Sequence, residues 1–490
     1  MLATLLIVVP LAAALVIWVL PLPRETTAGI AVLAALAEVG LWVGGVFDFS
    51  LSPLGIEWVD FGSDQQLFGT SRAWFEELGV SYAVGFYGFQ FWLTGLTVVV
   101  GACAIGYAMW VGRDRPRAYY GLVLFLVGSL VGVFASQDLL LFYVFFEAML
   151  IPLYVLIGVW GGPQRVKATV TFVIYTMAGS LLMLASVVAF GIGQGTFSLA
   201  TSGTSSNDWI FLGFVAAFAV KAPLFPFHGW LRDAYTQAPP EVSALLSGVV
   251  SKAAVFGLIW VVLPHFPGPV EDFRGLLLVL AAATLVYGSL LAFRQPDIRG
   301  VVAYSSMAQM GLITLGIFAT NDLGLDGAVL QSVNHGLVSA AMFLLAGMVE
   351  ERCGTGQLSA LGGMAKGRPL LATLVLTTGM IVLAVPGSAT FTGEFSILAG
   401  VFDHGWGYAA VGAAGIVIAA MYGLRLISAL LHEGRGSSVP EDSPDLRAGE
   451  LGLVVPLVAI LLVLSAWPAA VSGNSFPGDA PAETIAGVGG

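Results

Sequence analysis

The sequence is poor in charged residues. Asp, Glu, Lys and Arg make up only 10% of its 490 residues, and only four residues are lysines, whereas about 25% of a soluble protein is charged. Apolar residues account for 58% of the chain, and the mean hydropathy is +0.91. So few charges cannot cover a soluble surface, which excludes an ordinary soluble protein. The composition instead predicts a polytopic membrane protein with little mass outside the bilayer.

Cysteine and basic tracts are also scarce. The two cysteines, Cys103 and Cys353, are far apart and match no spacing typical of metal, haem or iron–sulfur sites, so we expect no cofactor on this chain. The net charge is −11 and no basic tract is present, which argues against a nucleic-acid partner. The first basic residue is Arg24. Because a signal peptide begins with basic residues, we expect the N-terminal apolar run to remain as the first membrane helix.

Long apolar runs dominate the sequence. Such runs indicate transmembrane helices, since the strands of a membrane barrel alternate over about 10 residues. The predicted fold class is an all-α polytopic membrane protein with about 14 transmembrane helices. The expected segments are 2–20, 28–47, 89–110, 118–135, 138–158, 168–191, 209–231, 242–263, 275–293, 300–319, 325–349, 370–402, 408–431 and 450–470. Residues 48–88, glycine-rich and aromatic, are expected to form a long loop on the membrane surface.

Basic residues in the loops indicate an orientation. Fourteen Lys and Arg residues follow odd-numbered segments, whereas the other loops hold only Arg72 and Arg274. Cytoplasmic loops carry the excess of Lys and Arg in membrane proteins. We therefore expect the odd loops in the cytoplasm and, with an even number of helices, both termini on the outer face of the cell inner (plasma) membrane.

Two groups of five segments predict an inverted repeat within a single membrane domain, 1–490. The first group covers 118–263 and the second 275–431, with flanking helices in 1–110 and 450–470. Because five is odd, the second group enters the membrane from the opposite face, an arrangement common in transporters.

The fourth segment of each group is expected to be broken. Segment 209–231, the seventh, contains Pro223 and Pro226, and each proline removes a backbone donor. Segment 370–402, the twelfth, carries Pro386–Gly387 near its middle. As a straight helix it would be roughly 48 Å long, against a hydrocarbon core of about 30 Å. Broken helices at matching positions point to a transport site.

Polar side chains lie near the middle of several segments. A charge at the bilayer centre costs roughly 2.5–3.5 kcal/mol on insertion scales, so it usually marks an ion or proton path. Burial favours the neutral form of a lysine or glutamate, whereas a neighbouring opposite charge favours the charged form. Histidine suits a proton shuttle. The candidates for proton transfer are Glu147, Lys221, Lys252, His335 and Glu394, with Gln309 as a candidate for lining a water path.

Structural roles compete with this interpretation. Glu147 and Lys221 could form an ion pair that only holds helices together, and Lys252 or Glu394 could also be structural. His335 and Gln309 could bridge helices by hydrogen bonds. Asp138, after Ser136–Gln137, is expected to cap a helix.

Several segments resemble a known family. The fragments FASQDLLLFYVFFEAMLIPLYVLIGVWGG (134–162), KAPLFPFHGWLRDAYTQAPPEVSALLSGVVSKAAVFGL (221–258) and VPGSATFTGEFSILAG (385–400) are similar to the antiporter-like membrane subunits of respiratory complex I. So are DIRGVVAYSSMAQMGLITLGIF (297–318) and NHGLVSAAMFLLAGMVEER (334–352), and the resemblance covers about residues 90–470. The family often has histidine where Gln309 stands, and because an amide does not titrate, that step would need water or another group.

The resemblance implies a function. It implies that the chain translocates protons, with Glu147 and Lys221 as a coupling pair, Lys252 as the central relay and Glu394 at the end of the line. Its partners would be the other membrane subunits of complex I, the lipid bilayer and protons, and redox chemistry would take place in other subunits. A cation/proton antiporter subunit of Mrp type, a subunit of a membrane-bound hydrogenase and a scaffold that does not pump are alternatives.

Overall fold

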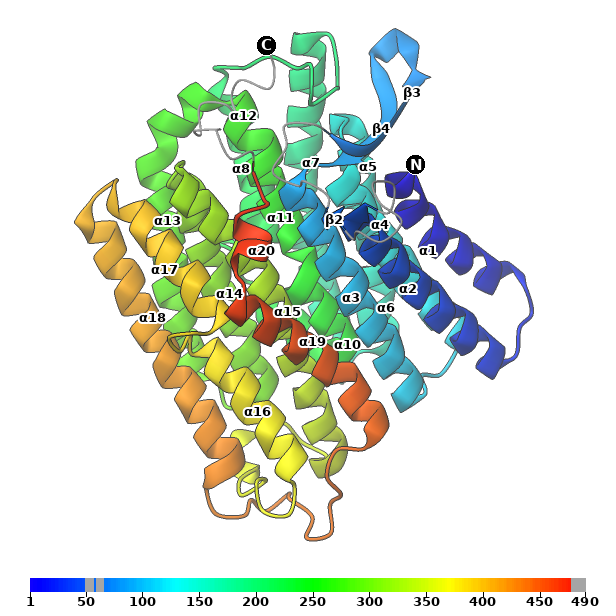
Figure 1. Ribbon diagram of the computed structural model, residues 1–490, viewed down its shortest axis with the longest axis vertical. Coiled ribbons are helices and arrows are strands. Elements are labelled where there is room, and N and C mark those ends of the chain that lie inside the picture. Colours follow the sequence, from blue (N-terminus) through cyan, green and yellow to red (C-terminus); the bar gives the residue numbers. More distant parts are fainter. Residues whose placement is uncertain (49–56, 59–65, 477–490) are drawn as a thin grey trace.

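A computed structural model describes residues 1–48, 57–58 and 66–476. The described chain is helical apart from four short strands (Figure 1). The helices before the first break are α1 (Leu2–Val19), α2 (Arg24–Val46), α3 (Gly88–Val111), α4 (Pro116–Ala135), α5 (Leu139–Ala148), α6 (Leu150–Trp160), α7 (Arg165–Gln194) and α8 (Asp208–Lys221). Those that follow are α9 (Leu231–Gln237), α10 (Pro240–Leu245), α11 (Lys252–Gly257), α12 (Leu263–His265), α13 (Pro267–Arg294), α14 (Ile298–Phe318) and α15 (Asp322–Cys353). The last are α16 (Pro369–Val382), α17 (Ala389–Phe402), α18 (Trp406–Ile427), α19 (Ala448–Ala466) and α20 (Ala469–Ser472).

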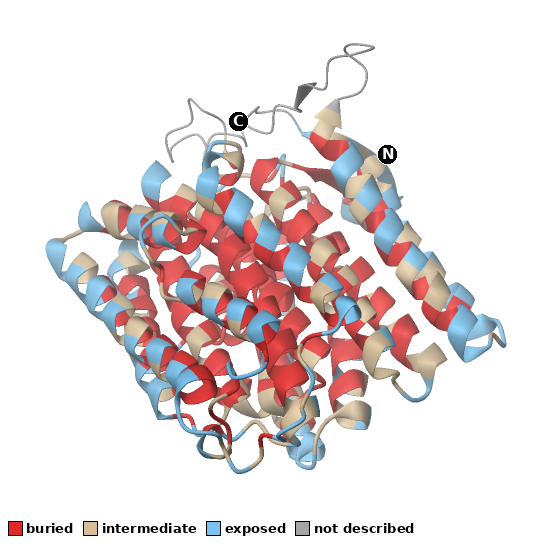
Figure 2. Ribbon diagram, turned by 60° about the horizontal axis from the view of Figure 1, so that its bottom comes forward, coloured by how far each residue is buried: buried red, intermediate tan, exposed pale blue. Residues whose placement is uncertain are grey.

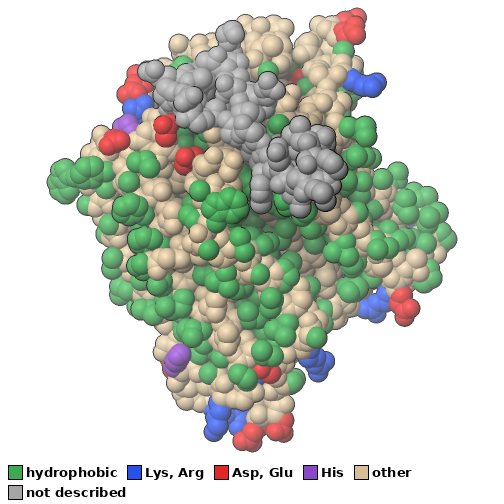
Figure 3. Space-filling view, in the orientation of Figure 1, with side chains coloured by type: hydrophobic (Ala, Val, Ile, Leu, Met, Phe, Trp, Pro, Cys, Tyr) green, Lys and Arg blue, Asp and Glu red, His purple; other side chains and the backbone are tan. Residues whose placement is uncertain are grey.

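The long helices run between two ends of the molecule, and their surroundings differ with position. α15 is buried along its whole apolar window, whereas only a third of the corresponding window is buried in α1, α2 and α19. Figure 2 shows this contrast between a buried interior and exposed outer helices. On the face shown in Figure 3, charged side chains gather near the ends and apolar side chains cover the zone between them. This distribution is the one that a bilayer requires of a multi-pass protein.

The expected all-α membrane fold is confirmed. Within the described residues, twelve helices are long and apolar enough to span a membrane. The seventh and twelfth expected segments are instead pairs of shorter helices, α8 with α9 and α16 with α17. The total of fourteen crossings and the inverted repeat remain predictions.

Both predicted breaks are present. α8 ends at Lys221, directly before the segment that contains Pro223 and Pro226, and α9 begins at Leu231. α16 ends at Val382 and α17 begins at Ala389. Gly387 between them has a φ of +91°, a conformation that residues with a Cβ rarely adopt. The prolines remove helix donors at both places, so each break follows from local chemistry.

Two further irregularities lie beside charged residues. The expected segment 138–158 is divided into α5 and α6 at Met149. Pro152 has no N–H to donate to the carbonyl of residue 148, which explains this interruption. Lys252 lies between two π-helical stretches, Leu246–Val250 and Leu258–Val262. Such π-bulges occur frequently at functional sites.

The prediction that residues 48–88 form only a surface loop is wrong in part. The structure has an antiparallel hairpin there, β3 (Leu67–Phe75) and β4 (Val80–Phe86), and a separate short pair, β1 (Phe47–Asp48) and β2 (Glu57–Trp58). Residues 49–56 and 59–65 of the expected loop lie outside the described residues. Gly79, with a φ of +67°, ends the turn between β3 and β4. The hairpin exposes Trp74 and Phe75, whereas the side chain of Trp58 lies outside the described residues.

The basic loops meet at one end of the molecule, and the N-terminus and the last described residues lie at the other. Arg24 donates to the carbonyl of Gly112, and Arg299 donates to that of Ala238, so loops distant in sequence are joined at the basic end. At the opposite end the amino group of Met1 contacts the carbonyl of Phe68 in the hairpin. The carbonyl of Ser475 accepts from the N–H of Phe89 at the same end.

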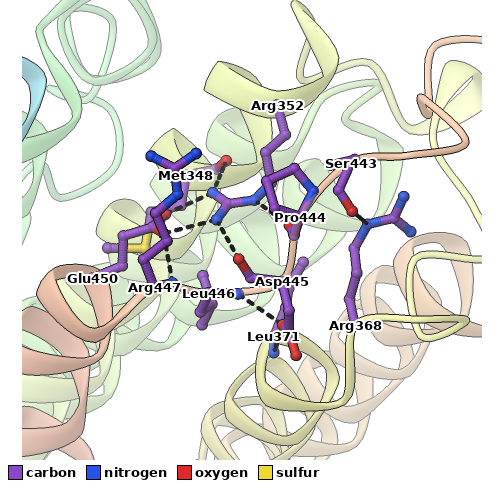
Figure 4. A network of polar contacts seen from close by, with 10 residues as sticks. All are labelled: Met348, Arg352, Arg368, Leu371, Ser443, Pro444, Asp445, Leu446, Arg447 and Glu450. Atoms are coloured by element: carbon purple, nitrogen blue, oxygen red, sulfur yellow. Dashed lines mark hydrogen bonds and ion pairs between the residues drawn. The ribbon is translucent and has the colours of Figure 1, made fainter.

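A polar network around a buried ion pair ties three helices together at the basic end (Figure 4). Arg352 at the end of α15 contacts Glu450 in α19 through two bonds of 2.6 and 2.8 Å. Asp445, in the loop before α19, accepts from the N–H groups of Leu370 and Leu371 at the start of α16. This network anchors the first half of the second broken helix to α15 and α19.

Candidate functional site

Lys252 and His335 form the central contact of the site. The Nζ of Lys252 lies 2.7 Å from Nδ1 of His335 on α15, and both residues are buried. The same Nζ donates to the carbonyl of Ser247 at 2.8 Å and to the hydroxyl of Ser251 at 3.3 Å. The π-helical stretch before Lys252 brings these groups around the ammonium. A lysine and a histidine at this distance can exchange a proton directly.

Gln331 and Gln309 form a hydrogen-bonded chain that ends on Glu394. Gln309 on α14 donates through Nε2 to Oε1 of Glu394 at 2.8 Å, and it accepts from Nε2 of Gln331 on α15 at 2.8 Å. All three residues are buried. Gln309 therefore bridges α14, α15 and α17, while its amide cannot itself give up or take a proton at ordinary pH.

A small cavity is lined by residues of both groups. It has a volume of about 30 Å³ and is lined by His335, Gln309 and Gln331, among others. Nε2 of His335 and Oε1 of Gln331 are buried and have no hydrogen-bond partner among the residues that the structure describes. Apolar side chains such as Val338 and Met342 line the cavity as well. It has room for about one water molecule, which needs two to four polar partners. The two unpartnered polar atoms of His335 and Gln331 are candidates for such partners.

Glu147 and Lys221 are not joined directly. Lys221 is buried, and within the described part of the chain its Nζ has no hydrogen-bond partner. It lies 5.1 Å from the ring centroid of Phe146 and 5.9 Å from that of Phe172, so two aromatic faces surround the ammonium. Oε1 of Glu147, the residue that follows Phe146 in α5, is likewise buried and has no hydrogen-bond partner among the described residues. The expected ion pair is therefore absent among the described contacts.

The structure brings together four of the six predicted residues in two pairs. Lys252 contacts His335, and Gln309 contacts Glu394. Glu147 and Lys221 interact electrostatically without a hydrogen bond. No group of three His, Cys, Asp or Glu residues that could hold a metal occurs in the ranges that the structure describes.

Sequence reasoning missed several polar residues beside the line. Gln331 precedes His335 by one helical turn, a spacing that places both on one face of α15. Ser247 contacts the hydroxyls of Ser306 and Ser339 at 2.8 and 2.5 Å, next to Lys252. Glu38, in the apolar run of α2, is only 1% exposed, and both its carboxylate oxygens are buried with no partner in the part of the chain that the structure describes. A charge inside the expected segment 28–47 was the available signal for Glu38.

The fold and the buried charges define a class, which is a polytopic helical membrane protein with antiporter-like architecture. The chain belongs to the family described as NADH:quinone oxidoreductase/Mrp antiporter, TM, whose family model matches residues 136–419. The matched region contains all six predicted residues. The resemblance to the antiporter-like subunits is thereby confirmed.

Curated relatives and solved structures agree with this membership. The chain is 34% identical over 445 residues to NADH-quinone oxidoreductase subunit M of Rhodobacter capsulatus, covering 87% of this chain and 86% of the relative. It is 32% identical to subunit M of Pseudomonas aeruginosa, covering 94% of both. A chain of respiratory complex I from Thermus thermophilus superposes with a TM-score of 0.88 at 31% identity, covering 100% of both chains. A chain of the Mrp complex from Dietzia sp. has a TM-score of 0.84 at 20% identity, with 100% of this chain and 55% of that chain covered, which shows a shared fold.

Proposed function

We propose that this chain is a proton-translocating, M-type membrane subunit of an NADH–quinone oxidoreductase. It carries protons along the line Glu147, Lys221, Lys252, His335 and Glu394, while quinone reduction takes place in other subunits. The relatives named subunit M cover nearly the whole chain in both directions, which supports assembly with the other membrane subunits of such a complex. We also propose the inner (plasma) membrane as its location, with both termini on the outer face, because the basic loops gather at the opposite end.

One observation carries the proposal. Lys252 and His335 are in contact, Gln309 and Glu394 are in contact, and one small cavity is lined by His335 of the first pair and Gln309 of the second. Buried titratable groups within hydrogen-bonding reach, or separated by one water, meet the geometric requirement for stepwise proton transfer. Charged residues inside a membrane protein mark proton relays by default, since their burial is costly.

The mechanism starts at the pair without a direct bond. Two aromatic faces lie near the ammonium of Lys221, and no described residue forms a hydrogen bond with it. A small approach or withdrawal of Glu147 therefore changes how well the positive charge is stabilised. Withdrawal favours release of the Lys221 proton, and approach favours its uptake. Lys252 and His335 pass a proton to each other, and water in the cavity passes it beyond Gln309 to Glu394. Moving one charge against 100 mV costs about 2.3 kcal/mol, which electrostatic changes between buried charges can supply.

The test uses the assembled complex in membrane vesicles. We expect Glu147→Ala and Lys221→Ala to abolish proton translocation coupled to NADH oxidation, while native gels show normal assembly. Arg274→Ala is a matched control, because Arg274 pairs with Glu271 in the first turns of α13, far from the line in sequence. Normal coupled translocation in either line variant would contradict the proposal. A sodium-dependent proton flux without NADH would instead favour a cation/proton antiporter subunit of Mrp type.

A further inference from the structure

The start of α17 is held on two sides by side chains from other helices. The N–H of Ala389, the first residue of α17, donates to Oγ of Ser465 on α19 at 2.9 Å. Nδ2 of Asn334 on α15 donates to the carbonyl of Ala389 at 2.8 Å. The first N–H groups of a helix have no partner within the helix. Inside a membrane such groups must be satisfied by protein, so these contacts fix where α17 begins after the break.

Asn334 also connects this break to the central contact. Its neighbour in the sequence, His335, contacts Lys252, and Gln331, one turn earlier, contacts Gln309. Three side chains on one stretch of α15 therefore reach the relay lysine, the glutamine beside Glu394 and the start of α17. Asn334 is fully buried, where an amide donor without a hydrogen bond is costly, and its Nδ2 meets this need through the carbonyl of Ala389.

We propose that Asn334 and Ser465 are positioning residues that couple His335 to Glu394 through the start of α17. Glu394 follows Ala389 by five residues, which is about 7.5 Å along the helix. A displacement of α15 at His335 is transmitted through Asn334 to Ala389, and α17 carries it to Glu394 as a rigid element. Ser465 provides the fixed point on α19. This inference rests on the proposed proton-translocating function and names the residues that link two of its steps.

A second asparagine provides a matched comparison. Asn321, at the start of α15, donates through Nδ2 to the carbonyl of Gly400 near the end of α17, at 2.9 Å. The bond joins the same two helices with the same donor and acceptor types, but it lies away from the break. If the asparagines only hold α15 against α17, removing either should have the same effect on proton translocation. If Asn334 positions Glu394, only its removal should uncouple translocation.

The experiment compares serine variants in the intact complex. Asn334→Ser and Asn321→Ser both remove the amide donor, and serine remains a good helix cap at position 321. In vesicles, we measure protons translocated per NADH oxidised, and complex content on native gels. For Asn334→Ser the number of protons translocated per NADH should fall about two- to tenfold, which is the factor that corresponds to the free energy of one hydrogen bond. Asn321→Ser should keep the ratio of the unmodified complex.

Ser465 provides a second, independent comparison. Ser465→Ala removes the acceptor for the N–H of Ala389 and should lower the ratio by a similar factor, whereas Ser465→Thr keeps a hydroxyl and should restore it. Equal ratios for Asn334→Ser and Asn321→Ser, or for Ser465→Ala and Ser465→Thr, would overturn the inference.

Lys252→Met, measured in parallel, distinguishes a failure of the proposed proton-translocating function from a failure of the positioning role of Asn334 and Ser465. A normal ratio in Lys252→Met would overturn the proposed function itself, and the present inference with it. Loss of translocation in Lys252→Met together with a normal ratio in Asn334→Ser would overturn only the inference.

Discussion

Removing Glu450 should destabilise the protein strongly, because its partner is a buried cation. The side chain of Arg352 is 7% exposed and that of Glu450 is 0% exposed. Their two charge-assisted bonds measure 2.6 and 2.8 Å. In Glu450→Ala, Arg352 loses both charge-assisted bonds and keeps hydrogen bonds to the carbonyls of Met348, Pro444 and Asp445. Removing one partner of a buried pair costs about 3–5 kcal/mol, and we expect a loss in this range.

A second ion pair at the same end of the molecule provides the control. Arg435 and Glu441 are joined at 3.0 Å, but their side chains are 49% and 82% exposed. Such exposed pairs contribute about 0–1 kcal/mol, so Glu441→Ala should change little.

The assay is thermal unfolding of the purified chain in detergent, with both variants measured at the same pH and salt concentration. Adding Arg352→Met to Glu450→Ala should recover part of the loss, since it removes the unpaired charge. Equal unfolding temperatures for Glu450→Ala and Glu441→Ala would refute this reasoning about the buried pair.

Three further predictions follow from particular contacts. In α13, Gly288→Ala should cost about 1–3 kcal/mol of stability, because a Cβ there would lie 2.8 Å from the backbone nitrogen of Ala308. Gly275→Ala is the control: its Cβ would have no atom within 4 Å, so the substitution should be neutral or stabilising in the same thermal assay. Burial opposes ionisation of Asp445, but hydrogen bonds from the N–H groups of Leu370, Leu371 and Leu446 outweigh it and hold its pKa below 3.8. The ionised Asp445 therefore contributes its full stabilisation above pH 3.8, and this stabilisation is lost as the pH falls through the lower pKa of the folded state. When thermal stability is measured at decreasing pH, Asp445→Asn should lack this loss. A pH profile unchanged by the substitution would contradict the role of Asp445. Gln309→Leu should lower NADH-coupled proton translocation about tenfold, because it leaves Oε1 of Glu394 without its donor. Gln309→His supplies a donor that can also titrate and should retain translocation. Equal rates in these two variants would count against the role of Gln309.

The features that could be predicted from the sequence are those with a local cause. The breaks after Lys221 and after Val382 follow from prolines that cannot donate a hydrogen bond. Asp138 caps α5, as expected, by accepting from the N–H groups of Leu140 and Leu141. The individual polar candidates could be found because a charge in an apolar run is conspicuous at any position along the chain.

Contacts between distant segments could not be found in this way. The contact of Lys252 with His335 depends on how the π-helical stretches beside Lys252 turn its side chain toward α15, and no residue pattern encodes that turn. Lys221 faces aromatic rings in place of Glu147 because of packing between α5, α7 and α8. The β3–β4 hairpin did carry a signal, two runs with aromatic and β-branched residues around Gly79. That signal is weak beside the long apolar runs that flank it.

The central claim is that Lys252–His335 and Gln309–Glu394 belong to one continuous proton path. The most direct test is an experimental map of the assembled complex at a resolution that shows ordered water. It should contain water in the cavity of about 30 Å³, within hydrogen-bonding distance of Nε2 of His335 and of Oε1 of Gln331. A dry cavity, with apolar side chains separating His335 from Gln309 and Glu394, would contradict the account.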